Sequence, residues 1–261
     1  MMNEISVLKR FLEFPISSTA EIFDEFKTIE GHIFREKNAD SKKRFLYVEG
    51  KREDKALLIA HADTYFDKGC FSEKHAIVEE NGIFRAVDEY GEPQLLGADD
   101  RAGIAMLWLL KDSGHSLLIT DGEENGRIGS KWLMSENKPI ADRINSEHQF
   151  MILLDRCNGT DYKCYRVGTD DFRRFIEEQT GYSEPNRTSF VFADICTLCR
   201  DICGVNFSIG YYNQHSVNET LNIQEWLNTL NVVRKLLANE QLPKFSKFPF
   251  FFEKNGKKVA I

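Results

Sequence analysis

Short, wholly apolar runs separated by amphipathic stretches constrain the fold of this 261-residue chain more than any other feature. The run Ala56 to Ala60 is apolar on both faces, and similar runs cover Leu117 to Ile119, Phe150 to Leu154 and Phe190 to Phe192. Runs of this length without a polar face are typical of strands that are covered on both sides. Apolar residues alternate at positions 205, 207 and 209 and predict a last strand.

Helical patterns lie between these strands. The first helix is expected to end near Phe14, because Pro15 follows it. Ala102 to Leu110 is apolar on nearly all sides, as expected of a helix packed between a sheet and other helices. Further helices are predicted near residues 19 to 29, 127 to 135, 170 to 179 and 223 to 237. Strands that alternate with helices predict an α/β domain with three αβα layers around one central sheet.

A β-hairpin is predicted over residues 76 to 87, because Asn81-Gly82 separates two short apolar segments. The hairpin indicates that the central sheet is mixed and mostly parallel. Residues 1–240 contain no repeat and no low-complexity linker, and they are expected to form a single catalytic domain without an accessory lid domain. Residues 241–261 form a basic tail rich in phenylalanine, for which we expect packing on the domain, with an exposed interface surface as the alternative.

Composition narrows the classes of partner. The formal net charge is −7 and the pI is about 5.5, so the chain lacks the basic patch that nucleic acids or anionic membranes attract. Residues 1 to 14 lack the features of a signal peptide, and no apolar run reaches the length of a membrane span. The six cysteines are interpreted as reduced thiols, because a chain with a full core does not need disulfides, and a cytoplasmic location is expected.

Five segments place a histidine or a carboxylate directly after a predicted strand. They are His61-Ala62-Asp63, Gly97-Ala98-Asp99-Asp100, Asp121-Gly122-Glu123-Glu124, Asp155-Arg156 and Asn213-Gln214-His215. In an α/β sheet, the crevice beyond the carboxyl ends of the strands is where ligands and catalytic groups gather. The five segments can therefore converge on one site.

Residue spacing within these segments suggests distinct roles. His61 and Asp63 are two positions apart, so an extended backbone points both to one side, where Asp63 can orient the imidazole of a metal-binding His61. The neighbouring Glu123 and Glu124 would repel each other and Asp121 unless a cation or protonation offsets their charge. One carboxylate of this pair can bind metal while the other holds the attacking water.

Two histidines and three carboxylates suit zinc or a similar divalent ion. A carboxylate that bridges two ions would hold them about 3.5–4 Å apart, and such a pair lowers the pKa of water and stabilises the oxyanion of a tetrahedral intermediate. Amide hydrolysis is the reaction class that this chemistry favours.

The motifs also support a resemblance to a known family. The sequence resembles the zinc-dependent exopeptidase superfamily of bacterial aminopeptidases, tripeptidases and related deacylases over about positions 5 to 238. The residues that carry the resemblance are Leu58–Asp63, Leu96–Gly103, Thr120–Gly126, Leu153–Asp155 and Tyr212–Ser216.

This resemblance implies two zinc ions per chain. Asp99 would bridge both ions, His61 and Asp155 would complete one, and Glu124 and His215 the other. Glu123 would be the general base and Asp63 would orient His61, so that Glu123 and Asp63 are the expected catalytic residues. A cis peptide bond between Asp99 and Asp100 is also implied.

The chain departs from its relatives in length. Only residues 156 to 214 separate Asp155 from His215, and only residues 62 to 98 separate His61 from Asp99, the two places where relatives insert accessory domains. The grip on the substrate that such a domain supplies must be absent, or must come from the hairpin, the tail or another subunit. A homo-oligomer is therefore one of the expectations.

Other residues have weaker interpretations. Cys196, Cys199 and Cys203 are spaced for one face of a helix, where they are either buried core residues or thiolate ligands of a second metal site with Cys157 or Cys164. Asp194 is either a hydrogen-bonding partner of the metal-site scaffold or a helix N-cap. Tyr211 or Tyr212 can donate to an oxyanion, and the histidines outside the motifs are expected to be surface or capping residues: His32, His75, His115 and His148.

The leading hypothesis is an aminopeptidase or small-peptide exopeptidase in which Glu123 takes a proton from the attacking water and passes it to the leaving amine. The first alternative is an N-acyl amino acid deacylase on the same scaffold, because the metal motifs do not encode the side-chain pocket. The second alternative is a metal-stabilised binding protein without catalysis.

Overall fold

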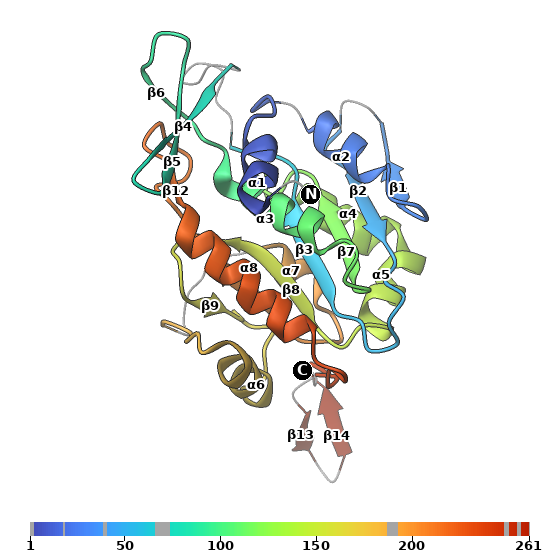
Figure 1. Cartoon of the computed structure of the whole chain (residues 1–261). Helices are drawn as coiled ribbons and strands as arrows, with labels where there is room; N and C mark the ends of the chain where they lie inside the picture. Colours follow the sequence, from blue (N-terminus) through green and yellow to red (C-terminus); the bar gives the residue numbers. More distant parts are fainter. Residues whose placement is uncertain are drawn as a thin grey trace.

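The chain forms a three-layer αβα arrangement (Figure 1). The computed structural model describes residues 3–17, 19–38, 41–65, 74–186, 193–247, 251–254 and 257–260. Within these residues the central sheet has seven strands in the order β1 (Ile33–Glu36), β2 (Arg44–Val48), β7 (Ser116–Thr120), β3 (Leu57–His61), β8 (Met151–Arg156), β10 (Gly204–Ser208) and β9 (Tyr162–Lys163). Strands β7, β3, β8 and β10 are parallel to their neighbours in this series, whereas β2 and β9 pair antiparallel. The predicted mixed α/β sheet is confirmed.

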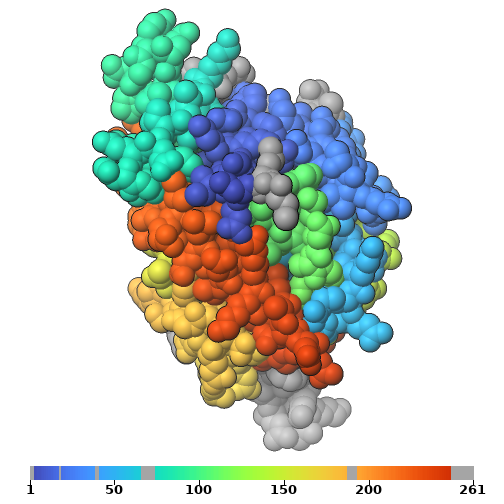
Figure 2. Space-filling model, in the orientation of Figure 1, coloured from blue at the N-terminus to red at the C-terminus, as the bar shows by residue number. Residues whose placement is uncertain are grey.

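Helices cover both faces of the sheet. One face carries α1 (Glu4–Leu12), α2 (Ala20–Phe26), α3 (Ala98–Leu110), α6 (Asp170–Thr180) and α8 (Ile223–Leu237). In the space-filling view, α1 borders α8 (Figure 2), whereas most of α3 is buried. The other face carries α4 (Ile128–Glu136), α5 (Lys138–Ser146) and α7 (Asp194–Leu198).

The apolar runs are explained by these two helical layers. In β3, Leu58 and Ala60 belong to the buried cluster on one face, while Leu57 and Ile59 belong to the cluster on the other. Successive side chains of a strand point to opposite faces, so a strand between two layers needs apolar residues at every position.

The predicted hairpin forms, but it belongs to a second sheet. Strands β4 (Ala76–Glu80) and β5 (Ile83–Val87) pair around Asn81 and Gly82, which both have positive φ angles of 53° and 77°. This sheet continues from β5 to the remaining short strands, β6 (Pro93–Gln94), β12 (Thr220–Asn222) and β11 (Tyr211–Tyr212). The central sheet is therefore mixed because of β2 and β9, and the expected contribution of the hairpin to it was wrong.

One local prediction was also wrong. Helix α7 ends at Leu198, so Cys196, Cys199 and Cys203 do not share a helical face; Cys203 directly precedes β10. His115 and His148 are both buried, and each contacts a carbonyl in the last turn of a helix, as the capping alternative predicts: His115 Nε2 lies 3.1 Å from Leu237 O of α8, and His148 Nδ1 lies 3.1 Å from Ile144 O of α5.

The tail is described in part. Phe245 packs against Phe150, Phe172 and Phe175 with ring centroids 6.2, 5.0 and 5.0 Å away. Strands β13 (Phe251–Lys254) and β14 (Lys257–Ala260) pair antiparallel. Phe248 and Phe250 lie outside the described residues, as does the strand predicted at 190 to 192. In the described part of the chain, no helix is both long and apolar enough to span a membrane.

Candidate metal centre

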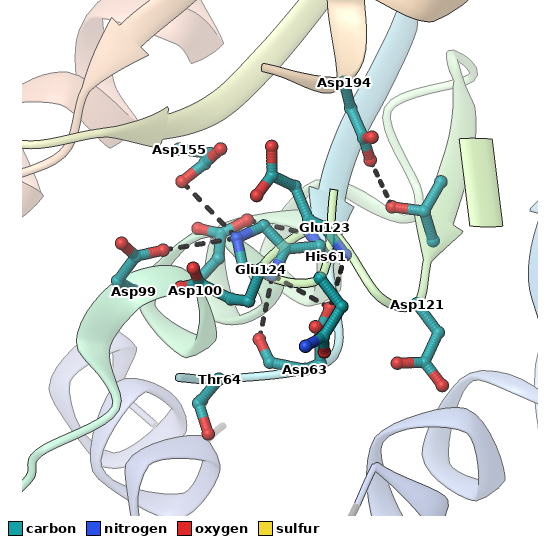
Figure 3. Close-up of polar contacts among 12 residues, drawn as sticks. His61, Asp63, Thr64, Asp99, Asp100, Asp121, Glu123, Glu124, Asp155 and Asp194 are labelled. Atoms are coloured by element: carbon teal, nitrogen blue, oxygen red, sulfur yellow. Dashed lines mark hydrogen bonds and ion pairs between the residues drawn. The ribbon is translucent and has the colours of Figure 1, made fainter. Parts of the chain in front are cut away.

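Four of the five predicted ligand residues, His61, Asp99, Glu124 and Asp155, gather at the carboxyl ends of the parallel strands (Figure 3). The fifth, His215, contacts Asp99 and Glu124 of this group. His61 is the last residue of β3, and Asp155 lies near the end of β8. Asp99 stands in the first turn of α3, where its ψ angle of 99° is not helical. Glu124 follows β7, and His215 lies in the loop between β11 and β12. Because parallel strands end at one edge of the sheet, residues far apart in the sequence become neighbours.

Asp99 lies between the two histidines. Its Oδ1 is 3.2 Å from Nε2 of His61, and its Oδ2 is 3.3 Å from Nε2 of His215. His61 Nε2 is also 3.5 Å from Oδ1 of Asp155, and His215 Nε2 is 2.7 Å from Oε1 of Glu124. His61 Nε2 thus lies beside Asp99 and Asp155, and His215 Nε2 lies beside Asp99 and Glu124.

Asp63 contacts both the histidine and the neighbouring acidic segment. His61 Nδ1 is 2.8 Å from the backbone oxygen of Asp63 and 3.3 Å from its Oδ1. The same Oδ1 accepts a hydrogen bond from the backbone N–H of Glu123 at 3.0 Å. The expected contact between Asp63 and His61 is thus present. The backbone oxygen of Asp63 lies closer to His61 Nδ1 than its carboxylate does.

Buried side chains also tie the ligand-bearing turns to one another. Asp100 Oδ2 accepts a hydrogen bond from the backbone N–H of His61 at 2.9 Å. The peptide bond between Asp99 and Asp100 is cis, as the resemblance implies. Glu219 accepts the backbone N–H groups of Gly97 at 2.7 Å and of Asp99 at 3.0 Å. Sequence analysis missed Glu219, because a carboxylate in a polar loop carries no signal that it is fully buried.

Asp155 and Asp194 are held in similar ways. Asn206 on β10 accepts the backbone N–H of Asp155 at 3.0 Å and donates to its backbone oxygen at 2.8 Å. Asp194 is fully buried and accepts hydrogen bonds from the hydroxyls of Thr120 and Ser130, while the N-cap of α7 is Ala193. The scaffold interpretation of Asp194 is therefore confirmed, since Thr120 pairs with His61 in the sheet.

The two tyrosines near His215 differ. Tyr211 is buried, and its hydroxyl donates to Oδ1 of Asp155 at 3.3 Å. Tyr212 donates to Glu225 on α8 at 2.7 Å. Tyr211 is therefore the tyrosine that reaches the cluster.

Burial of so many carboxylates shifts their pKa values. Burial raises the pKa of Glu123 to about 9 and that of Asp155 to about 7, although His61 offsets part of each shift. Hydrogen bonds to Asp99 and then Glu124 raise the pKa of His215 to about 10. For Asp99, burial opposes ionisation, but hydrogen bonds from His215 and His61 outweigh it and hold the pKa below its ordinary range. The cluster therefore retains protons that a divalent cation would displace.

The donor set fits a metal ion. Two groups have ligand atoms within 4.8 Å of one another: His61 with Asp99 and Glu124, and His61 with Asp100 and Asp155. Imidazole and carboxylate donors in this number suit zinc. Oδ1 of Asp100 is buried and has no hydrogen-bond partner among the described residues, a costly arrangement that a cation nearby would relieve. The groups found in the described residues contain no cysteine, so the thiolate site finds no support.

Comparison with known proteins identifies the fold. No family model and no curated protein matches the chain. The aminopeptidase PepT from Bacillus cereus matches 89% of this chain and 96% of its own, with a TM-score of 0.62 and 13% identity. A tripeptidase from Staphylococcus aureus matches 90% and 98%, with a TM-score of 0.63 and 14% identity. This chain has the fold of these peptidases.

A third solved structure extends the comparison. The TET1 peptidase from Pyrococcus horikoshii matches 90% of this chain and 99% of its own, with a TM-score of 0.55 and 14% identity, and that protein can assemble into a tetrahedron or a large octahedral shell. The predicted resemblance is thus confirmed at the level of the fold, which this chain shares with solved aminopeptidase and tripeptidase structures.

Proposed function

We propose that this chain is an aminopeptidase or small-peptide exopeptidase that uses two zinc ions. His61 and Asp155 would hold one ion, Glu124 and His215 the other, and Asp99 would bridge them. The observation that carries the proposal is the position of Asp99, whose two carboxylate oxygens face one histidine each at 3.2 and 3.3 Å.

The chemistry follows from charge. When bound, the two ions polarise the peptide carbonyl and lower the pKa of the attacking water. Burial raises the pKa of Glu123, and positive charge at the centre would lower it again. Glu123 would then be ionised and able to act as a base. Glu123 then accepts a proton from the attacking water and returns it to the leaving amine.

Asp63 has a positioning role in this proposal. Its carboxylate holds the backbone of Glu123, and its backbone oxygen and carboxylate both contact the imidazole of His61. The general base and a ligand are thereby fixed relative to each other, as amide hydrolysis requires.

Further features of the proposal draw on the comparisons and on composition. The substrate class, a small peptide, is supported by the peptidase fold of the neighbours. Self-association is supported by the assemblies of the TET1 peptidase. A cytoplasmic location and the absence of nucleic acid and membrane partners stay predictions from composition.

The test combines metal analysis with a substrate panel. Purified protein is loaded with zinc and analysed for metal, and its hydrolysis of aminoacyl-nitroanilides, dipeptides, tripeptides and N-acetyl amino acids is measured before and after chelation. We expect about two zinc ions per chain and cleavage of free peptides that chelation abolishes. Absence of bound zinc would overturn the proposal, and cleavage confined to N-acetyl amino acids would replace it with a deacylase.

A further inference from the structure

A cavity lies directly beside the proposed metal centre. Its volume is about 470 Å³, within the range of small-molecule sites. Asp63 and Glu124 line it from the side of the centre, and Ile16, Thr64 and Tyr65 supply other parts of its wall. Tyr65 also stacks on His215, with ring centroids 4.8 Å apart. A substrate whose amide lies at the centre therefore has space to extend into this cavity.

Two cations line the cavity, and their surroundings differ. Arg44 is bound to Asp121 and, at 3.1 Å, to Glu36, so its charge is neutralised by two carboxylates. Lys42 contacts the neutral Oδ1 of Asn125 and pairs with one carboxylate, Asp63, whose Oδ2 lies 3.5 Å from its ammonium group. The side chain of Lys42 is 40% exposed. Lys42 is thus the lining cation that retains capacity for a further anionic partner.

We propose that Lys42 binds a carboxylate of the substrate and makes the enzyme selective for short peptides that carry one near the scissile amide. This inference rests on the proposed function. Lys42 lies in the turn between β1 and β2, next to Asn125, which follows the proposed ligand Glu124. The loop that carries Lys42 would then supply a grip on the substrate.

A carboxylate can come from two sources, the C-terminus of a short peptide or an acidic side chain. Trialanine carries the first, glutamyl-alanine amide the second, and trialanine amide neither. The experiment measures KM and kcat of the zinc-loaded protein for all three, for wild type, K42M and K42R. K43M is the matched control, because Lys43 pairs with Glu136 at 3.6 Å and does not line the cavity.

We expect K42M to raise KM for one carboxylate substrate about 10- to 100-fold more than KM for trialanine amide, the effect of one charge-assisted hydrogen bond. K42R should restore most of the loss, and K43M should match wild type. The affected substrate identifies the source of the carboxylate. Equal changes for all three substrates, or a loss confined to kcat, would overturn the inference and leave the peptidase function intact.

Wild-type kinetics give a second measurement that does not depend on the folding of K42M. The proposal requires KM for trialanine amide to exceed KM for trialanine or for glutamyl-alanine amide by at least about tenfold. Equal values for the three substrates would overturn it. If zinc-loaded wild type cleaves no peptide, the proposed function is refuted, and the selectivity with it. If it cleaves all three substrates with equal KM, only the selectivity is refuted.

Discussion

Glu123 is the residue at which metal binding and catalysis can be separated. It stands beside the proposed ligands but is not a member of either group of residues whose atoms lie within 4.8 Å of one another and could hold an ion. Glu123→Gln removes the base without changing the size of the side chain, so we expect kcat to fall about 10²- to 10⁴-fold while zinc content stays at the wild-type value. Kinetics and elemental analysis check this, with Glu136→Gln on the exposed face of α4 as the control. Unchanged turnover in the zinc-loaded variant would exclude Glu123 as the base.

Glu219 joins the two segments that carry Asp99 and His215. It is buried, accepts two backbone N–H groups from the Gly97–Asp99 turn, and follows His215 in the same short loop. An amide accepts only through its oxygen, so Glu219→Gln leaves one N–H facing an NH₂ group. We expect zinc affinity to fall about 10- to 100-fold in competition titrations against a chelator. Glu225→Gln, which alters a partner of Tyr212 outside the centre, should keep the wild-type affinity.

His148 gives the fold a pH dependence of its own. Burial, and then the positive charge of Lys55, lower its pKa from 6.5 to about 3, although the hydrogen bond with Ile144 O at 3.1 Å acts in the opposite direction. The unfolded chain binds a proton below pH 6.5 while the folded chain does not, so stability falls as pH drops from 6.5 towards 3. At pH 5 the loss is about 2 kcal/mol.

The matching measurement is urea unfolding of metal-free protein at pH 7.5 and pH 5. Wild type should lose about 2 kcal/mol more than His148→Gln over this interval, because glutamine does not titrate. Equal losses would show that His148 is protonated inside the folded protein.

At the scale of elements, the sequence predicted what depends on local pattern. The apolar runs located β3, β7 and β8, and the Asn81-Gly82 turn located the β4–β5 hairpin. Three of the proposed ligands stand at or just after the ends of these runs, namely His61, Glu124 and Asp155, whereas Asp99 lies at the start of α3 and His215 in a loop. Local pattern therefore positions most of the candidate site.

Elements that depend on distant partners were not predictable. Strands β11 and β12 have two and three residues, too few for an alternation of apolar and polar residues to be recognised. Strand β12 forms because Leu221 pairs with Phe84, which is far away in the sequence. Glu219 stands directly before β12, so its role was hidden for the same reason. Helix α7 ends before Cys199 because the chain there turns towards β10, a consequence of tertiary structure.

Gly103 sets the distance between α3 and β8. A Cβ at this position would lie 2.1 Å from the backbone oxygen of Leu154 and 2.3 Å from Oδ1 of Asp100. Helix propensity alone predicts that Gly103→Ala stabilises the protein by about 1 kcal/mol. We expect the opposite sign, a loss of about 1–3 kcal/mol from overpacking, together with weaker zinc binding because α3 carries Asp99.

Chemical denaturation and zinc titration measure both effects. Ala105→Gly on the same helix provides the control, since it costs about 1 kcal/mol of helix propensity but does not push α3 away from β8. A stabilised Gly103→Ala protein with wild-type zinc affinity would show that the helix can move away without cost.

In the whole molecule, the proposed metal centre and the tail segment around Phe245 lie at opposite ends of the parallel strands. The proposed ligands lie at the carboxyl ends of the strands, whereas Phe245 lies at their amino ends, where Phe245 N donates to Gln149 O and Cys203 N donates to Phe245 O. Gln149 and Cys203 each precede a central strand. The tail segment around Phe245 is therefore part of the fold but remote from the chemistry.

This separation predicts that stability and metal affinity change independently. Phe245→Ala removes a half-buried ring from a cluster with Phe150, Phe172 and Phe175, which should cost about 2 kcal/mol. Zinc affinity and kcat of the folded variant should stay at wild-type values, because the sheet between the two ends is closely packed and changes little when one aromatic contact at its edge is lost. Thermal melting of the metal-free protein and zinc titration below the transition test this pair of expectations. A variant that melts at the wild-type temperature would show that the tail adds no stability, whereas weaker zinc binding would show that the two ends of the sheet are coupled.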